Sequence, residues 1–235
     1  MTTSESLRSK KNLTRRFLRN LAELLFWLLT RIEIIGRENI PPRGGILMTT
    51  NHVSRLDPIL LFILLERSDA TVLAAEKYKK NLVFHWAIES VGGIWLKQDE
   101  ADLDALRAAR EHLKAGGLLG IAPEGTRSRT GGLIRGKTGA AYLVDKARVP
   151  VVSVALWGTE SVWRQLARLR RPRIFVHIGP AFELPPVERR QREADLRRNT
   201  DEIMCRIAAM LPPRYWGVYA DHPRLEELIS GNPQP

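Results

Sequence analysis

The sequence predicts an α/β fold in which helices flank a largely parallel central sheet, with an amphipathic membrane-interface helix at the N-terminus. Short apolar runs alternate with helix-length segments along the chain, which is typical of parallel sheets built from β-α-β units. Pro and Gly residues fall mainly between these segments. With 235 residues, 44% of them hydrophobic and 27% charged, the chain has the length and composition of one globular core.

The expected strands are short apolar runs bounded by turn residues or charges. In order they are 32–36, 46–50, 71–75, 94–97, 118–122, 149–156 and 173–179. Pro41, Pro42, Gly44 and Gly45 predict the turn between the first two.

The expected helices lie between these strands and after the last one. They are 58–66, 78–90, 101–115, 136–147, 159–169 and 188–210. The segment 101–115 is the most clearly amphipathic, and Gly116 and Gly117 end it.

The N-terminal segment has apolar residues at helical spacing after a basic start. They are Leu13, Phe17, Leu21, Leu24 and Leu28. Such a helix is typical of a segment lying in a membrane interface, and the alternative is a helix packed on the core. Its longest uncharged apolar run is 24–30, far below the roughly 18 to 20 residues that a membrane span needs. We therefore expect peripheral or monotopic attachment on the cytoplasmic face of a membrane.

These patterns divide the chain into three parts. Residues 1–31 form the basic, amphipathic segment, residues 32–215 the main α/β domain, and residues 216–235 a C-terminal extension.

The formal net charge of +11 calls for an anionic partner, which could be nucleic acid, anionic lipid or a phosphorylated substrate. Of the 37 basic residues 28 are Arg, whose planar fork suits phosphate. No nucleic-acid-binding motif occurs, so we expect no nucleic-acid partner. The single cysteine, Cys205, excludes an internal disulfide framework, and no histidine has a metal-ligand spacing, so we expect no metal site.

Residues 51–57 (Asn-His-Val-Ser-Arg-Leu-Asp) follow an expected strand and precede an expected helix. Open α/β sheets place their sites in such loops. His52 can accept a proton near neutral pH when a carboxylate fixes its tautomer, and Asp57 is the nearest candidate. Asp57 also resembles an N-cap of the following helix, with Pro58 at the first helical position, and its two carboxylate oxygens can serve both roles.

Residues 123–128 (Pro-Glu-Gly-Thr-Arg-Ser) directly follow the expected strand 118–122. In a parallel sheet this loop opens at the same edge as His52. Gly125 lets a ligand approach the backbone, Thr126 offers a hydroxyl, and Arg127 offers a fork for phosphate. Glu124 either bonds a substrate hydroxyl or holds Arg127. The alternative is a plain turn with Arg127 at the surface.

Together these residues resemble the glycerolipid acyltransferase family, which has four sequence blocks. The first (Asn-His-x-Ser-x-x-Asp) and the third (Pro-Glu-Gly-Thr-Arg-Ser) are matched in full at 51–57 and 123–128. The second appears at 92–98, with Gln98 where the family has arginine. The fourth appears at 149–154, with Ser153 in place of its second proline.

This resemblance implies acyl transfer from an acyl thioester to the hydroxyl of 1-acyl-sn-glycerol-3-phosphate, giving phosphatidic acid. His52 and Asp57 would be catalytic, without a metal or a covalent enzyme intermediate. The implied acceptor-binding residues are Glu124, Gly125, Thr126 and Arg127, with Lys97 beside the substituted Gln98. Acyl-CoA or acyl-acyl carrier protein would be the co-substrate, with no other cofactor.

The expected partners are thus an acyl thioester donor, a lysophospholipid acceptor and an anionic membrane surface. One alternative is an acyltransferase for another lysolipid or hydroxylated lipid. The other is a non-enzymatic protein that binds nucleic acid or lipid.

Overall fold

The computed structural model describes residues 19–64, 67–80, 85, 88–89, 92–97 and 102–231, and within α2 the side chains only to residue 61. Within these residues one sheet contains strands at all seven expected positions. They are β1 (Arg31–Ile35), β2 (Ile46–Thr50), β3 (Ala70–Ala75), β4 (Ile94–Leu96), β5 (Leu118–Ile121), β6 (Val151–Trp157) and β7 (Arg173–Ile178).

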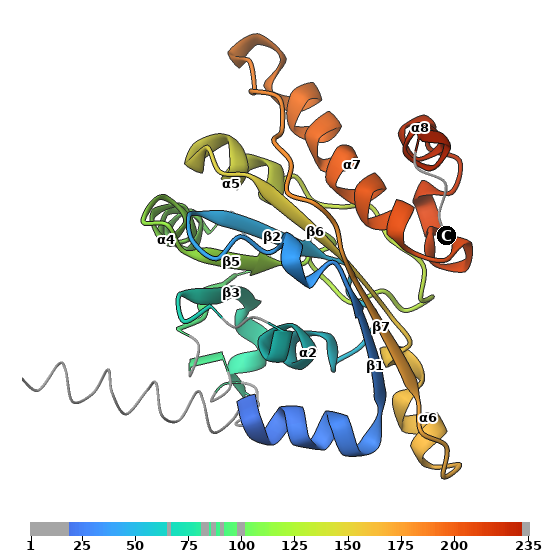
Figure 1. The fold of residues 1–235 in the computed structure, drawn as a ribbon. Helices are drawn as coiled ribbons and strands as arrows, with labels where there is room; N and C mark the ends of the chain where they lie inside the picture. Colours follow the sequence, from blue (N-terminus) through green and yellow to red (C-terminus); the bar gives the residue numbers. More distant parts are fainter. Residues whose placement is uncertain are drawn as a thin grey trace, which may run out of the picture.

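The sheet order is β1-β7-β6-β2-β5-β3-β4 (Figure 1). The pairs from β6 through β2, β5 and β3 to β4 are all parallel, which confirms the largely parallel sheet. β7 runs antiparallel to β6, and β1 runs parallel to β7, so these two strands point the opposite way. β2 lies in the middle, and its carboxyl end therefore opens between β5 and β6.

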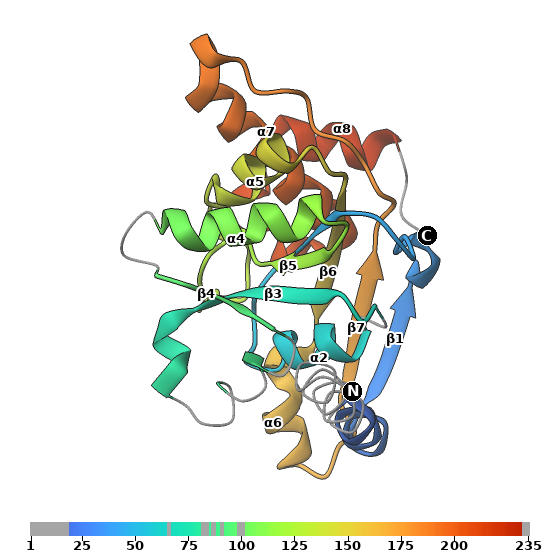
Figure 2. The same cartoon turned by 90° about the vertical axis from the view of Figure 1, so that its left-hand side faces the viewer.

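Helices cover both faces of the sheet (Figures 1 and 2). One face carries α4 (Leu103–Lys114), α5 (Gly139–Ala147), α7 (Arg192–Met210) and α8 (Pro223–Gly231). The other carries α2 (Asp57–Leu64), α6 (Val162–Leu166) and a helix at residues 19–29.

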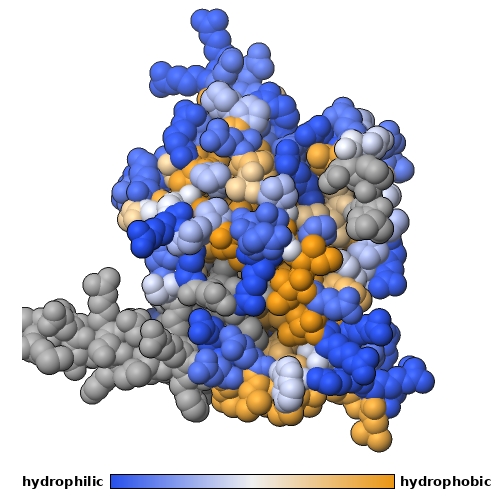
Figure 3. Space-filling model, in the orientation of Figure 1, coloured by the Kyte–Doolittle hydropathy of each residue, from blue (hydrophilic) through white to orange (hydrophobic). Residues whose placement is uncertain are grey.

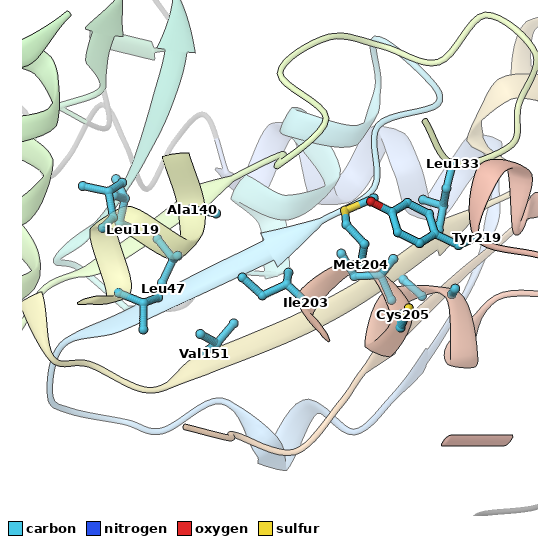
Figure 4. Packing of buried hydrophobic residues seen from close by; sticks show 14 of the residues in the cluster. Leu47, Leu119, Leu133, Ala140, Val151, Ile203, Met204, Cys205 and Tyr219 are labelled. Atoms are coloured by element: carbon cyan, nitrogen blue, oxygen red, sulfur yellow. The ribbon is translucent and has the colours of Figure 1, made fainter. Parts of the chain in front are cut away.

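Strand β2 shows why these apolar runs become central strands. Its five side chains are all buried, and they alternate between the two faces. Leu47 packs in one apolar cluster with α4, α5 and α7, while Ile46 and Met48 pack in a second with α2 and α6. Figure 4 shows part of the first cluster, with Leu47 and Leu119 near Ala140 of α5 and Val151 closer to Ile203 of α7.

Several boundaries differ from those expected. The helix expected at 136–147 begins at Gly139, and the helix expected at 159–169 is a 3₁₀ turn, Thr159–Ser161, followed by the short α6. The expected helix 78–90 falls mostly outside the described residues, and Glu76–Lys80 form a 3₁₀ helix, η2.

The two ends of the chain relate differently to the core. The 216–235 segment, expected as an extension, contributes Tyr219 and Leu225 to the first cluster through α8 and the turn before it. At the N-terminus the basic start of the expected helix lies outside the described residues. In the helix at 19–29 Phe26 is buried in the second cluster, while Trp27 is exposed.

Candidate active site

The loop after β2 brings His52 and Asp57 together, as the spacing predicts. His52 Nδ1 lies 2.9 Å from Asp57 Oδ2, and the imidazole is 17% exposed, whereas the carboxylate is buried. Asp57 Oδ2 also accepts hydrogen bonds from the backbone N–H of Val53 and Ser54, at 2.8 and 2.7 Å. An oxygen that accepts from two amides also accepts from His52, so Nδ1 carries the proton and Nε2 has its lone pair available.

Asp57 is the first residue of α2, but its carboxylate turns back toward the loop. Among the described residues its side-chain hydrogen bonds go to the loop, to His52 and to one further residue, and none goes to the first turn of α2. The capping role considered from the sequence is therefore replaced by closure of the loop around His52.

The further residue is Thr159, which sequence reasoning did not identify. Its hydroxyl donates to Asp57 Oδ1 at 2.6 Å, and Thr159 is fully buried. It follows β6 immediately after Gly158, whose φ of 91° makes the turn. Thr159 thus holds the carboxylate from the side opposite His52. A threonine 102 residues away has no local pattern that would reveal this contact.

Asn51 secures the start of the loop. Its side-chain amide donates to the carbonyl of Leu156 at 2.7 Å, and its carbonyl accepts from the N–H of Leu156 at 2.8 Å. Asn51 is fully buried, so the side chain continues the pairing of β2 with β6 past the end of the strand. The backbone that carries His52 is consequently fixed to the sheet.

Glu124 lies next to His52, but its partners are backbone amides. Oε1 accepts from the N–H of His52 at 2.8 Å, and Oε2 accepts from the N–H of Ile134 at 3.1 Å. Glu124 is 1% exposed, and burial raises the pKa of its carboxyl group to about 7, although the two amide hydrogen bonds oppose this shift. These two bonds position the backbone of His52 relative to the 123–128 loop, and among the described residues no hydrogen bond or ion pair joins Glu124 to Arg127.

A second contact ties the two loops together, because the N–H of Ser128 donates to the carbonyl of His52 at 2.8 Å. The segment between Glu124 and Ser128 faces outward: Thr126 is exposed and Arg127 is half-buried. Gly125 has a φ of 67°, and a Cβ there would lie 3.0 Å from Cδ of Lys137. Arg127 and Lys137 thus place two cations around the loop that holds His52.

Lys97 lies farther from this centre. It follows β4 at the edge of the sheet, and β3 separates β4 from β5, whose loop carries Arg127. The backbone N–H of Lys97 donates to Asp102 Oδ2 at 3.0 Å, which caps α4. Gln98 lies outside the described residues.

The described residues contain no group of three or more His, Cys, Asp or Glu side chains placed to hold a metal ion. Their chemistry is that of an oriented imidazole base, buried on one side and open on the other, with cations within the adjoining loop. Such an arrangement suits removal of a proton from a hydroxyl group whose carrier is anionic.

Comparison with known proteins gives consistent matches. A family model described as Acyltransferase matches residues 31–157, just over half of the chain. A curated 1-acyl-sn-glycerol-3-phosphate acyltransferase of Borreliella burgdorferi is 23% identical over 81% of this chain and 77% of its own length. One from Chlamydomonas reinhardtii is 29% identical over 80% of this chain, which spans about half (55%) of that relative.

A solved structure shares the fold. The crystal structure of the 1-acyl-sn-glycerophosphate (LPA) acyltransferase PlsC from Thermotoga maritima superposes with a TM-score of 0.62 and 26% identity. The match covers 83% of this chain and 79% of that one.

Proposed function

Since the chain belongs to the acyltransferase family, as its motifs indicated, we propose that it transfers an acyl group to the hydroxyl of 1-acyl-sn-glycerol-3-phosphate. The product would be phosphatidic acid. The observation that carries the proposal is the bond from the N–H of His52 to Glu124, which unites two motifs 72 residues apart in one site. The two relatives and the solved structure described above bear names of this activity.

In the proposed reaction His52 Nε2 takes the proton of the acceptor hydroxyl while the hydroxyl oxygen attacks the thioester carbonyl. The new C–O bond forms, the C–S bond breaks, and the departing thiolate receives the proton from His52. Asp57 stabilises the imidazolium that exists between these steps, and Thr159 holds Asp57 in place. Base catalysis of this kind contributes roughly 10² to 10⁴ in rate.

Arg127 is the proposed ligand of the acceptor phosphate. It is half-buried, follows Gly125 and Thr126 at the rim of the loop, and makes no ion pair with another described residue. A guanidinium fork bonds a phosphate through two parallel N–H groups. Gly125 and Thr126 complete this subsite, and Lys97 is a more distant candidate.

The donor in this proposal is acyl-CoA or acyl-acyl carrier protein, with no further cofactor. The protein acts at the cytoplasmic face of an anionic membrane, because its acceptor is a lipid and its charge is +11. No helix among the described residues has the length and apolar character to cross a membrane. Attachment through the N-terminal segment fits the exposed Trp27 and neighbouring leucines.

A second acceptor class deserves the same assay, since Gln98 replaces the arginine of the second block. Loss of that cation weakens the case for a phosphomonoester and favours another lysolipid or a hydroxylated lipid.

Both are tested by incubating the purified protein with acyl-CoA and a panel of lysolipids, measuring thiol release and identifying products by mass spectrometry. Cys205 is fully buried and its pKa is raised to about 12 by burial, so the protein adds little thiol background. We expect phosphatidic acid from lysophosphatidate, abolished by His52→Ala and retained by the control His222→Ala. Wild-type thiol release by His52→Ala would refute the proposal.

A further inference from the structure

The turn that follows α6 exposes apolar side chains with no packing partner. Leu169 is 98% exposed and Trp163, on α6, is 68% exposed. Isolated apolar residues are ordinary on protein surfaces, but an almost fully exposed leucine beside an exposed tryptophan contributes nothing to the core.

The backbone conformation at position 169 is unusual for a leucine. Its φ of 54° lies in the left-handed region, which favours Gly or Asn and disfavours residues with a larger side chain. The N–H of Leu169 bonds the carbonyl of Leu166, so this conformation closes the end of α6. Folding alone would therefore be served better by asparagine or glycine at this position.

Basic residues surround these apolar side chains. No Asp or Glu occurs between residues 161 and 182. In the described part of the chain no carboxylate pairs with the arginines of this segment, which are Arg164, Arg168, Arg170, Arg171 and Arg173. Exposed apolar side chains in a segment whose arginines have no carboxylate partner are complementary to an anionic phospholipid surface.

The turn also adjoins the N-terminal helix. A guanidinium N–H of Arg171 donates to the carbonyl of Trp27, and Phe26 and Val162 share one apolar cluster. The helix at 19–29 exposes five leucines, four of which lie at i, i+3, i+4 and i+7 spacing: Leu21, Leu24, Leu25 and Leu28. Figure 3 shows apolar surface along the lower edge, over this helix, with hydrophilic surface beside it at the end that carries α6.

We propose that Trp163, Leu169 and the arginines between 164 and 171, here called the α6 tip, form a second membrane contact that inserts into an anionic phospholipid bilayer beside the helix at 19–29. The inference rests on the proposed function for its lipid acceptor. Thr159, which bonds Asp57, lies only four residues before Trp163. Docking of the α6 tip therefore sets the catalytic loop close to the bilayer that holds the acceptor.

Because Cys205 is the chain's only cysteine and is buried, a new surface cysteine can be labelled selectively. Leu169→Cys, carrying a polarity-sensitive fluorophore, should shift to shorter wavelengths with vesicles of phosphatidylcholine and phosphatidylglycerol. The matched control is Leu103→Cys, because Leu103 is 65% exposed on α4, which covers the opposite face of the sheet. Equal spectra at both positions, in a protein that co-sediments with the vesicles, would overturn the proposal.

Affinity is tested with Leu169→Asn. This substitution suits the left-handed backbone, so we expect an unchanged or higher Tm together with about tenfold weaker vesicle binding. The double variant Arg168→Gln/Arg170→Gln should weaken binding to anionic vesicles only, whereas Arg189→Gln/Arg190→Gln, in the 3₁₀ helix Arg189–Gln191 that precedes α7, should not weaken it. Unchanged binding by Leu169→Asn would overturn the contact.

These results are distinguishable from failure of the proposed function. Leu169→Asn should acylate lysophosphatidate at the wild-type rate when the lipid is presented in detergent micelles. Absence of that activity in the wild-type protein would refute the proposed function. The vesicle measurements would still show whether the α6 tip contacts the membrane. Binding of neutral and anionic vesicles with equal affinity would contradict the role of the arginines.

Discussion

Replacing Thr159 by valine removes one hydroxyl group and keeps the shape of the side chain. In the wild-type protein that hydroxyl is a donor to Asp57 Oδ1, at 2.6 Å, inside a fully buried environment. The valine methyl group cannot donate, so a buried carboxylate oxygen loses this hydrogen bond. A hydrogen bond to a charged group contributes about 1.5 to 3 kcal/mol, and the free energy of unfolding should fall by about 2 kcal/mol.

The same change should reach catalysis through Asp57. If about 1.4 kcal/mol of this loss is felt when the imidazolium forms, kcat falls about tenfold. The KM for the acceptor should stay near its wild-type value, because Thr159 is buried and follows β6, which β2 separates from β5 and the Arg127 loop.

Urea denaturation and steady-state thiol release measure the two effects separately. Thr159→Ser, which keeps the hydroxyl, should recover most of kcat. The control is Thr200→Val on α7, where an equally buried hydroxyl donates to the carbonyl of Leu196, and it should lower stability without lowering kcat. A wild-type kcat for Thr159→Val would refute the view that Thr159 positions Asp57 for catalysis.

Further predictions concern three other residues. Burial raises the pKa of Glu124 from its ordinary 4.5 to about 7, so the folded state keeps this proton to a higher pH than the unfolded state. The free energy of unfolding should therefore fall by up to about 3 kcal/mol as the pH rises from about 4.5 to about 7. Urea denaturation of Glu124→Gln should lack this pH-dependent loss. Asn51→Leu leaves the N–H and carbonyl of Leu156 unpaired, and chemical denaturation should show a loss of about 2 to 4 kcal/mol; a loss below about 0.5 kcal/mol would contradict this. In Gly158→Ala the new Cβ would lie 2.4 Å from the carbonyl oxygen of Arg173 at a φ of 91°, and we expect a lower Tm with reduced kcat, because Thr159 is the next residue.

Much of the fold follows from local pattern. The seven strands coincide with the predicted runs, and burial of β2 on both faces explains why its apolar run is continuous. The direction of β7 could not be obtained in this way, because hydrophobic periodicity is the same in either direction along a strand. Helix α8 was missed because its apolar face is short, and Leu225 is its single fully buried side chain.

In the site, the pair of His52 and Asp57 was easier to predict than the residues that hold it in place. His52 and Asp57 are five residues apart, and a loop at the end of a strand predicts their meeting. Thr159 bonds Asp57, 102 residues earlier in the chain, and Glu124 bonds His52, 72 residues earlier. Only the order of β2, β5 and β6 in the sheet brings these residues together. Glu124 was identified from its motif, but its two hydrogen bonds to backbone amides could not be predicted, because the sequence does not show that a carboxylate in a loop is buried.

The two hydrogen bonds to the backbone of His52 have a consequence for redesign of the enzyme. Glu124 accepts from the N–H of His52, and the N–H of Ser128 donates to the carbonyl of His52, so both ends of the 124–128 loop are anchored to the proposed catalytic base. Grafting a whole loop from a relative would disturb His52 along with the proposed acceptor site. A library confined to positions 126 and 127, with both anchors retained, would explore new acceptors while the catalytic geometry stays intact.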